Sequence, residues 1–203
     1  YIYTEAGRGS FVNPNLSKGK FYRLGFYINR MNPACMGLTT HELNLVVRKY
    51  GYELILGSNF ESDSNLSKWL EKEKQLDGII ITGIVDNLLL NDMLNFTLPY
   101  VVLGNYDIAV THPQVTFDIK GKIVRELSKV LSKLNVERCA AVVGTPDFRA
   151  DREAGEGFQQ ALQETGIKVF PELICHACSD GYREAVFLNE SVEKPDLIYI
   201  HGE

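Results

Sequence analysis

Two glycines bracket an arginine near the start of the chain, in Gly7-Arg8-Gly9. Short β-prone runs, Tyr1–Thr4 and Ser10–Val12, flank this tripeptide. Because glycine adopts positive φ readily, the pattern predicts a tight hairpin with Arg8 at its tip. An arginine on a narrow tip suits contact with phosphate or with the minor groove of DNA. Gly7, Arg8 and Gly9 are therefore candidate DNA-binding residues, although an incidental surface hairpin would show the same pattern.

A second set of polar residues follows the apolar runs of the chain. Asn29 and Asn32 come after the first run, Thr82 after the third and Asn105 after the fourth. If these runs are parallel strands, their carboxyl ends share one edge of a sheet, where open α/β folds bind ligands. Amide and hydroxyl groups both donate and accept hydrogen bonds, which suits a hydroxyl-rich ligand. Each residue could equally be a loop or helix-cap residue.

A third feature is Cys175-His-Ala-Cys178. A redox role would require a thioredoxin-like setting, and a structural zinc site would require two further ligands, which no second cysteine pair supplies. The spacing of Cys35, Cys139, Cys175 and Cys178 does not resemble a disulfide framework, so we expect a reduced, cytoplasmic protein without metal or cofactor. The sequence also contains neither a G-x-S-x-G elbow nor a phosphate-binding loop, and we expect no enzymatic activity.

The elements that position these residues alternate regularly. Near-continuous apolar strands that alternate with helices indicate parallel sheets covered on both faces, and hence an α/β fold. The expected strands are 22–28, 52–56, 78–81, 100–103, 115–117, 139–143, 169, 173–175 and 197–200. The expected helices are 33–50, 63–75, 86–95, 120–134, 149–165 and 180–188.

Charge is distributed unevenly along the chain. The net charge is −5, whereas residues 1–20 carry Arg8, Lys18 and Lys20 against Glu5 alone. The acidic remainder is a poor DNA-binding surface, because phosphate contact requires clustered lysine and arginine. No apolar run approaches the roughly 18 residues of a membrane span, and the first residues do not resemble a signal peptide. We therefore expect no membrane partner.

Several segments together resemble the effector-binding domain of LacI/GalR-type bacterial repressors. Leu76-Asp-Gly-Ile-Ile-Ile81 is similar to the family's V-D-G-I-I-L, and Arg152 to Leu162 is similar to its A-R-x-R-x-x-G-F-x-x-A-L. The other similar segments, in the same order as in the family, are 23–33, 50–56, 98–103, 115–118, 180–182 and 194–199. The resemblance implies a two-lobed, periplasmic-binding-protein-like (type I) fold with a small-molecule effector, a sugar or a sugar-like compound, bound between the lobes.

The opening hairpin resembles a second family. Ile2, Gly7 and Gly9 to Val12 are similar to the closing hairpin, or wing, of GntR-type winged-helix domains. A subset of GntR-type regulators joins a winged helix to a LacI-type sensor. The two resemblances together imply such a hybrid, with a wing at 1–13, a linker at 14–21, a first lobe at 22–135 and an incomplete second lobe at 136–203. We expect the other DNA-binding helices before Tyr1, and a homodimer on palindromic operator DNA.

The LacI-type resemblance adds site residues and also departures. It implies that Arg152 holds sugar hydroxyls with its guanidinium fork, that His176 faces the ligand, and that Glu203 stands where a ligand contact is usual. Ala154 replaces the second arginine of the family pattern, Gly104 replaces a frequent aspartate, and Gly202-Glu203 replaces Asn-Asp. An ordinary hexose therefore cannot be assumed as the effector. A free sugar-binding protein of a transport system is the alternative function.

Overall fold

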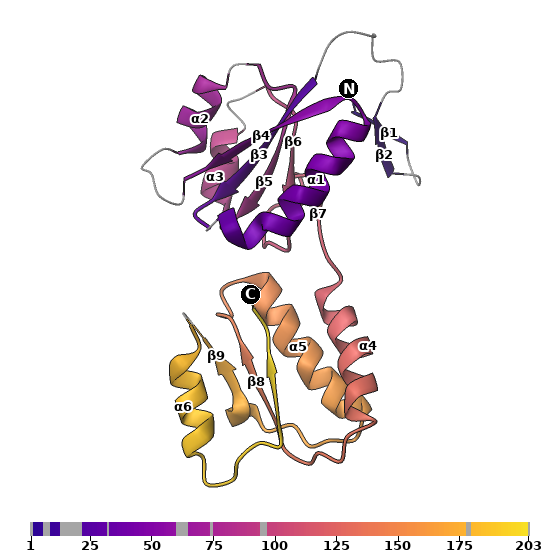
Figure 1. The fold of residues 1–203 in the computed structure, drawn as a ribbon, viewed down its shortest axis with the longest axis vertical. Helices are drawn as coiled ribbons and strands as arrows, with labels where there is room; N and C mark the ends of the chain where they lie inside the picture. Colours follow the sequence, from indigo (N-terminus) through magenta and orange to yellow (C-terminus); the bar gives the residue numbers. More distant parts are fainter. Residues whose placement is uncertain are drawn as a thin grey trace.

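The computed structural model describes residues 2–5, 9–12, 22–31, 33–59, 65–73, 75–93, 97–177 and 180–202. Two parallel sheets form two lobes (Figure 1). The first sheet has the strand order β4-β3-β5-β6-β7, and all its neighbouring strands are parallel. Its elements are β3 (Tyr22–Asn29), a 3-10 turn (Pro33–Met36), α1 (Gly37–Lys49), β4 (Tyr52–Ser58), α2 (Leu66–Lys72), β5 (Gly78–Gly83), α3 (Asn87–Met93), β6 (Tyr100–Leu103) and β7 (Gln114–Val115). The expected α/β fold with parallel sheets is confirmed.

The first lobe is built around Trp69 of α2. Its indole packs on Gly25 and Gly57 of two paired strands and lies 5.2 Å from the ring of Tyr27. A Cβ atom on Gly25 would lie only 2.8 Å from the indole, so glycine is what lets the helix approach the sheet. Since side chains alternate along a strand, the next residues in sequence face the opposite side, toward α1.

The second lobe has the strand order β10-β8-β9, also parallel. Its elements are α4 (Ile119–Leu131), β8 (Cys139–Val143), α5 (Arg149–Glu164), a 3-10 turn (Pro171–Leu173), β9 (Ile174–His176), α6 (Tyr182–Glu190) and β10 (Leu197–Ile200). Phe158 of α5 is fully buried against one face of the sheet, and Leu188 of α6 is buried against the other. Figure 1 shows α4 and α5 side by side, with α6 across the sheet.

The lobe boundary differs from the expected one. We expected the first lobe to reach residue 135, but Leu131 of α4 shares a core cluster with Phe158 and β8. The helix packs along α5 and therefore belongs to the second lobe (Figure 1). The chain passes between lobes just before Asp118, whose carboxylate caps α4 by accepting a hydrogen bond from Gly121 N at 3.0 Å. The apolar stripe of α4 could pack on either sheet, so its sequence could not decide this.

The N-terminal residues form the expected hairpin. Strands β1 (Ile2–Glu5) and β2 (Gly9–Val12) pair antiparallel, with Glu5 opposite Gly9. Gly9 therefore opens the second strand, while Gly7 and Arg8 lie outside the described residues, as does the expected linker. Over the described ranges, no helix has both the length and the apolar character needed to cross a membrane.

Candidate functional site

The carboxyl ends of both sheets face the junction between the lobes (Figure 1). This edge carries Asn29, Thr82 and Asn105 in the first lobe, and His176 in the second. The sequence placed Asn29, Thr82 and Asn105 at strand ends, and the structure puts each of them there. His176, which the resemblance singled out, is the last residue of β9. Asn32, Glu203 and Cys178 lie outside the described residues.

Asn29 is held entirely by the first lobe. It is 2% exposed, its Nδ2 donates to the carbonyl of Ile84 at 2.5 Å, and its Oδ1 accepts from Asn59 at 3.0 Å. The backbone of Asn29 also accepts from Ile84 N at 2.8 Å. Gly83, with φ +96°, fits against this backbone where any side chain would collide. The amide therefore fixes the loop after β5, which is the loop role left open for it by the sequence.

Thr82 is likewise occupied within its lobe. It is 4% exposed, and its hydroxyl donates to the carbonyl of Leu103 at 2.9 Å. The neighbouring Tyr106 hydroxyl donates to the carbonyl of Gly83 at 2.8 Å, and burial raises the pKa of this phenol. Thr82 and Tyr106 thus tie the ends of β5 and β6 together, and both keep acceptor lone pairs at this edge.

Asn105 joins the two lobes. Its Nδ2 donates to the carbonyl of Phe117 at 2.8 Å and to Glu153 Oε2 of α5 at 2.5 Å, while its Oδ1 accepts from Phe117 N at 2.7 Å. The other carboxylate oxygen of Glu153 accepts from Arg149 Nε at 2.7 Å. A chain of hydrogen bonds therefore runs from the end of β6 through Glu153 to the first turn of α5.

Arg152 forms the second link between the lobes. Its Nη2 pairs with the carboxylate of Asp107, in the loop after β6, and its Nη1 donates to the carbonyl of Pro146 at 2.8 Å. The hydrogen bond that Arg152 donates to the Asp107 carboxylate raises the pKa of the guanidinium. The guanidinium thus lies at the junction and binds protein oxygens there. The sugar contact that the resemblance implies for Arg152 stays a prediction.

Sequence reasoning missed Asp151 and His201. The Asp151 carboxylate lies against Gly144, where a side chain would collide with it, and 3.9 Å separates its Oδ1 from His201 Nε2. His176 Nδ1 donates to the carbonyl of Gly144 at 3.0 Å. Burial raises the pKa of Asp151, and the nearby His201 and His176 partly oppose this shift. The second lobe therefore presents one carboxylate and two imidazoles around the end of β8.

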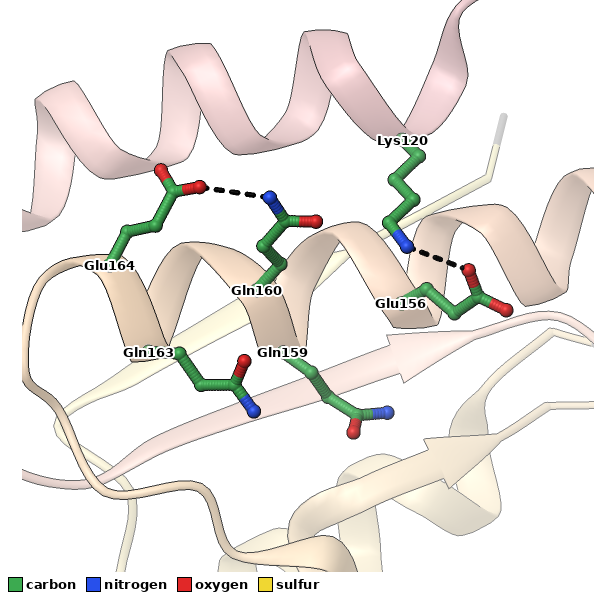
Figure 2. Close-up of a pocket in the computed structure, with 6 residues that line it drawn as sticks. All are labelled: Lys120, Glu156, Gln159, Gln160, Gln163 and Glu164. Atoms are coloured by element: carbon green, nitrogen blue, oxygen red, sulfur yellow. Dashed lines mark hydrogen bonds and ion pairs between the residues drawn. The ribbon is translucent and has the colours of Figure 1, made fainter.

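Of two cavities in the structure, one reaches the junction, where His201 and Phe117 line it, and the other does not. The latter, of about 530 Å³, lies on the outer surface of α4 and α5, where Lys120 pairs with Glu156 at 3.0 Å and Gln160 donates to Glu164 at 2.9 Å (Figure 2). Its amide and charged side chains form an open, solvated surface. The former, of about 720 Å³, lies between α4 and the end of β10, beside Phe117 and Tyr199.

Metal and thiol chemistry find no support in the part of the chain that the structure describes. That part holds no group of three or more His, Cys, Asp or Glu side chains arranged to bind a metal ion. Burial raises the pKa of the Cys175 thiol, which keeps it protonated and weakly nucleophilic.

Comparisons with solved structures are consistent with this architecture. A LacI transcriptional regulator from a Rhodococcus species matches with a TM-score of 0.73 and 16% identity over 89% of this chain and 67% of its own. A LacI-family regulatory protein from Chloroflexus aggregans matches with a TM-score of 0.68 and 15% identity, over 88% and 67% of the two chains. A complex of the transcriptional regulator CelR with cellobiose matches with a TM-score of 0.67 and 16% identity, over 89% and 58%.

The chain has the fold of LacI-family regulators. These identities are low, so the likeness concerns the fold. No protein-family model matches the sequence, and no curated protein matches it either. Function must therefore be inferred from the residues at the junction.

Proposed function

We propose that this chain is the sensor of a ligand-responsive transcription regulator, without enzymatic activity, which works in the cytoplasm. A small hydroxyl-rich effector, a sugar or a sugar-like molecule, binds where the two sheets face each other. The single observation that carries the proposal is the pairing of polar groups across this junction, Asn105 with Glu153 and Asp107 with Arg152. The fold shared with a cellobiose-bound regulator adds support.

The paired groups suggest how binding would be transmitted. Carboxylate, amide and guanidinium groups that now bind each other are the groups that recognise polyols. An effector that takes over some of these hydrogen bonds changes which orientation of the lobes is favoured, and such a change is the source of coupling to a second site. Arg152, Asn105, Glu153 and Asp107 are the proposed effector contacts at this junction, with His176, Asp151 and His201 on the second lobe. Thr82 contributes an acceptor; Asn32 and Glu203 remain proposed contacts on the sequence argument alone.

DNA binding is proposed for the N-terminal end. The antiparallel β1–β2 hairpin supports a wing. Arg8, which has Gly7 and Gly9 on either side of it in the sequence, is the proposed DNA contact. We propose that this hairpin closes a GntR-type winged helix and that the regulator acts as a homodimer, because a two-fold operator is matched by a two-fold protein.

A ligand screen tests the sensor role. The full-length protein is heated with monosaccharides, disaccharides, sugar acids and purines, one compound at a time. An effector binds only the folded protein and therefore raises its melting temperature. At a concentration one hundred times Kd, it adds about 2.7 kcal/mol to the free energy of unfolding. The R152A variant should lose at least about tenfold in affinity for that compound, whereas R125A, which removes an exposed pair with Asp118, should not.

A DNA-binding measurement tests the regulator role. Fluorescence anisotropy of promoter DNA with the full-length protein should show binding that changes when the effector is added. Effector binding without any DNA binding would instead favour a free sugar-binding protein. An effector whose affinity is the same for R152A and the wild type would contradict the proposed site.

A further inference from the structure

Asp151 and His201 face each other across a gap at the carboxyl edge of the second sheet. The distance from Asp151 Oδ1 to His201 Nε2 is 3.9 Å, which is too long for a hydrogen bond. Both side chains are mostly buried, with 20% of Asp151 and 27% of His201 exposed. Within the described residues, no hydrogen bond engages the Asp151 carboxylate or His201 Nε2. Two polar groups at such a spacing are suited to a third polar atom that bridges them.

The neighbouring Tyr199 fixes the orientation of the His201 ring. Its hydroxyl lies 3.3 Å from His201 Nδ1, and the two rings stack with their centroids 6.4 Å apart. Burial raises the pKa of Tyr199, so the phenol keeps its proton and can donate it to Nδ1. In the neutral imidazole the ring proton is then on Nε2, which is the nitrogen nearer Asp151. A donor and an acceptor thus stand on opposite sides of the gap.

The gap suits a hydroxyl group of a ligand. A hydroxyl oxygen can accept a hydrogen bond from His201 Nε2 while its proton is donated to Asp151 Oδ1. An ether oxygen cannot serve both groups, because it has no proton to donate. A ligand has room beside the pair, since His201 lines the cavity of about 720 Å³ at the junction.

We propose that Asp151 and His201 together bind one hydroxyl group of the effector and thereby determine which sugars the sensor accepts. The inference rests on the proposed function and deepens it, because it assigns the effector a free hydroxyl at this position. The bond to the Asp151 carboxylate is charge-assisted and is therefore the stronger of the two. A sugar without that hydroxyl leaves both side chains without a partner, which lowers its affinity.

Protonation of either side chain opposes this binding. A protonated Asp151 no longer offers a charged acceptor, and a protonated His201 attracts the carboxylate into a direct ion pair that closes the gap. Imidazole side chains change charge between about pH 5 and pH 8. The affinity for the effector should therefore fall as the pH decreases through this range, and binding should release protons.

The other charged groups near the pair have partners of their own or keep their charge. His176 Nδ1 donates to the carbonyl of Gly144 at 3.0 Å. Asp118 and Lys122 of α4 line the same cavity as His201, and the hydrogen bond from Arg125 lowers the pKa of Asp118. On α5, the remaining charged side chains of the first turns are engaged in ion pairs or hydrogen bonds: Arg149, Arg152 and Glu153.

Isothermal titration calorimetry of the full-length protein tests the pair, with D-glucose, D-galactose, D-ribose and cellobiose as probes. For the sugar that the wild type binds most tightly, D151A and H201F should each raise Kd at least about tenfold at pH 7.5, because each variant removes one partner of the hydroxyl. H41Q is the control, since His41 is exposed on α1 of the first lobe, and it should bind like the wild type. Circular dichroism verifies the fold of each variant.

A pH series separates this role from a purely structural one. The wild-type Kd should rise at least about threefold between pH 8 and pH 6, within the range where imidazoles titrate. H201Q places an amide nitrogen near the position of Nε2 but does not titrate. It should bind more weakly than the wild type at pH 8 and lose most of the pH dependence.

Mono-O-methyl ethers of the same sugar identify the hydroxyl itself. One of them should bind the wild type at least about tenfold more weakly than the parent sugar, because its ether oxygen cannot donate to Asp151. H201F should distinguish much less between these two compounds.

The outcomes separate this inference from the sensor role. A sugar that binds the wild type, D151A and H201F equally would overturn the inference and leave the sensor role intact. A wild-type Kd that is the same at pH 6 and pH 8 would overturn it as well. If none of the named sugars binds the wild type, the sugar-sensing role is contradicted together with this inference.

Discussion

The residues at the strand ends of the two lobes differ in burial and in hydrogen bonding. In the first lobe, Asn29 and Thr82 are almost fully buried and use their donors on backbone carbonyls of the same lobe. In the second lobe, His176 is exposed, and the Asp151 carboxylate lies 3.9 Å from His201 Nε2. The first edge is thus built for rigidity, while the second keeps polar groups that can exchange partners. Polar residues at strand ends are therefore of two kinds. Some are bonded within their own lobe and are structural, and others can bind a ligand; only their hydrogen-bond partners tell the two kinds apart.

The largest effect should come from breaking the rigid edge. In the N29A variant, the carbonyl of Ile84 and the amide of Asn59 lose their partner. Leaving buried polar groups unpaired costs about 2 kcal/mol of unfolding free energy. Urea denaturation measures this loss, and N189A, on the exposed surface of α6, is the control, with a midpoint near that of the wild type. A wild-type midpoint for N29A would remove the distinction between the two edges.

A smaller effect should come from the link between the lobes. In D107N, the ion pair with Arg152 is lost, but both partners are more than a third exposed. We therefore expect little change in the urea midpoint, because exposed ion pairs contribute little to stability. Amide hydrogen exchange in residues 104–112 should accelerate severalfold, since the loop loses its contact with α5.

The control for this prediction is amide hydrogen exchange of the D118N variant. D118N removes the Arg125 pair at the start of α4, which lies within one lobe. Its exchange rates in residues 104–112 should equal those of the wild type. Unchanged exchange in D107N would mean that the Asn105–Glu153 hydrogen bond alone holds the junction.

The elements were predictable from the sequence because their signals are local. Continuous apolar runs such as 78–81 become buried strands. The expected helix 86–95 begins at Asp86, whose carboxylate accepts a hydrogen bond from Leu89 N at 2.8 Å. The lobe of α4 was not predictable, because an apolar stripe does not specify which sheet covers it. The partner of Arg152 was not predictable either, because Asp107 lies 45 positions away in the sequence.

Of the two junction residues that the sequence analysis did not select, only His201 could have been found from the sequence. His201 directly follows an apolar strand, as Asn29 does, so the rule that selected Asn29 would also have selected His201. Asp151 had no comparable signal. It lies in the first turn of α5, and its importance depends on the approach of its carboxylate to Gly144, which is a tertiary contact. Local patterns thus locate the edge of a sheet, whereas the pairing of groups along that edge depends on long-range packing.

The smallest effect concerns Asp151, at the strand ends of the second lobe, and depends on pH. Burial raises the pKa of Asp151, so the folded state binds a proton more tightly than the unfolded chain does. The contribution of Asp151 to stability should therefore be fully present below the unfolded pKa, fall as the pH rises from there through the folded pKa, and stay constant above it. The D151N variant, which carries no charge at this position, should lose this component and show a slightly higher urea midpoint at pH 7. Urea midpoints of both proteins from pH 4 to pH 8 measure the difference. A lower midpoint for D151N at pH 7 would show that attraction by His201 and His176 outweighs desolvation, and that the carboxylate of the second lobe is as firmly held as the amide of the first.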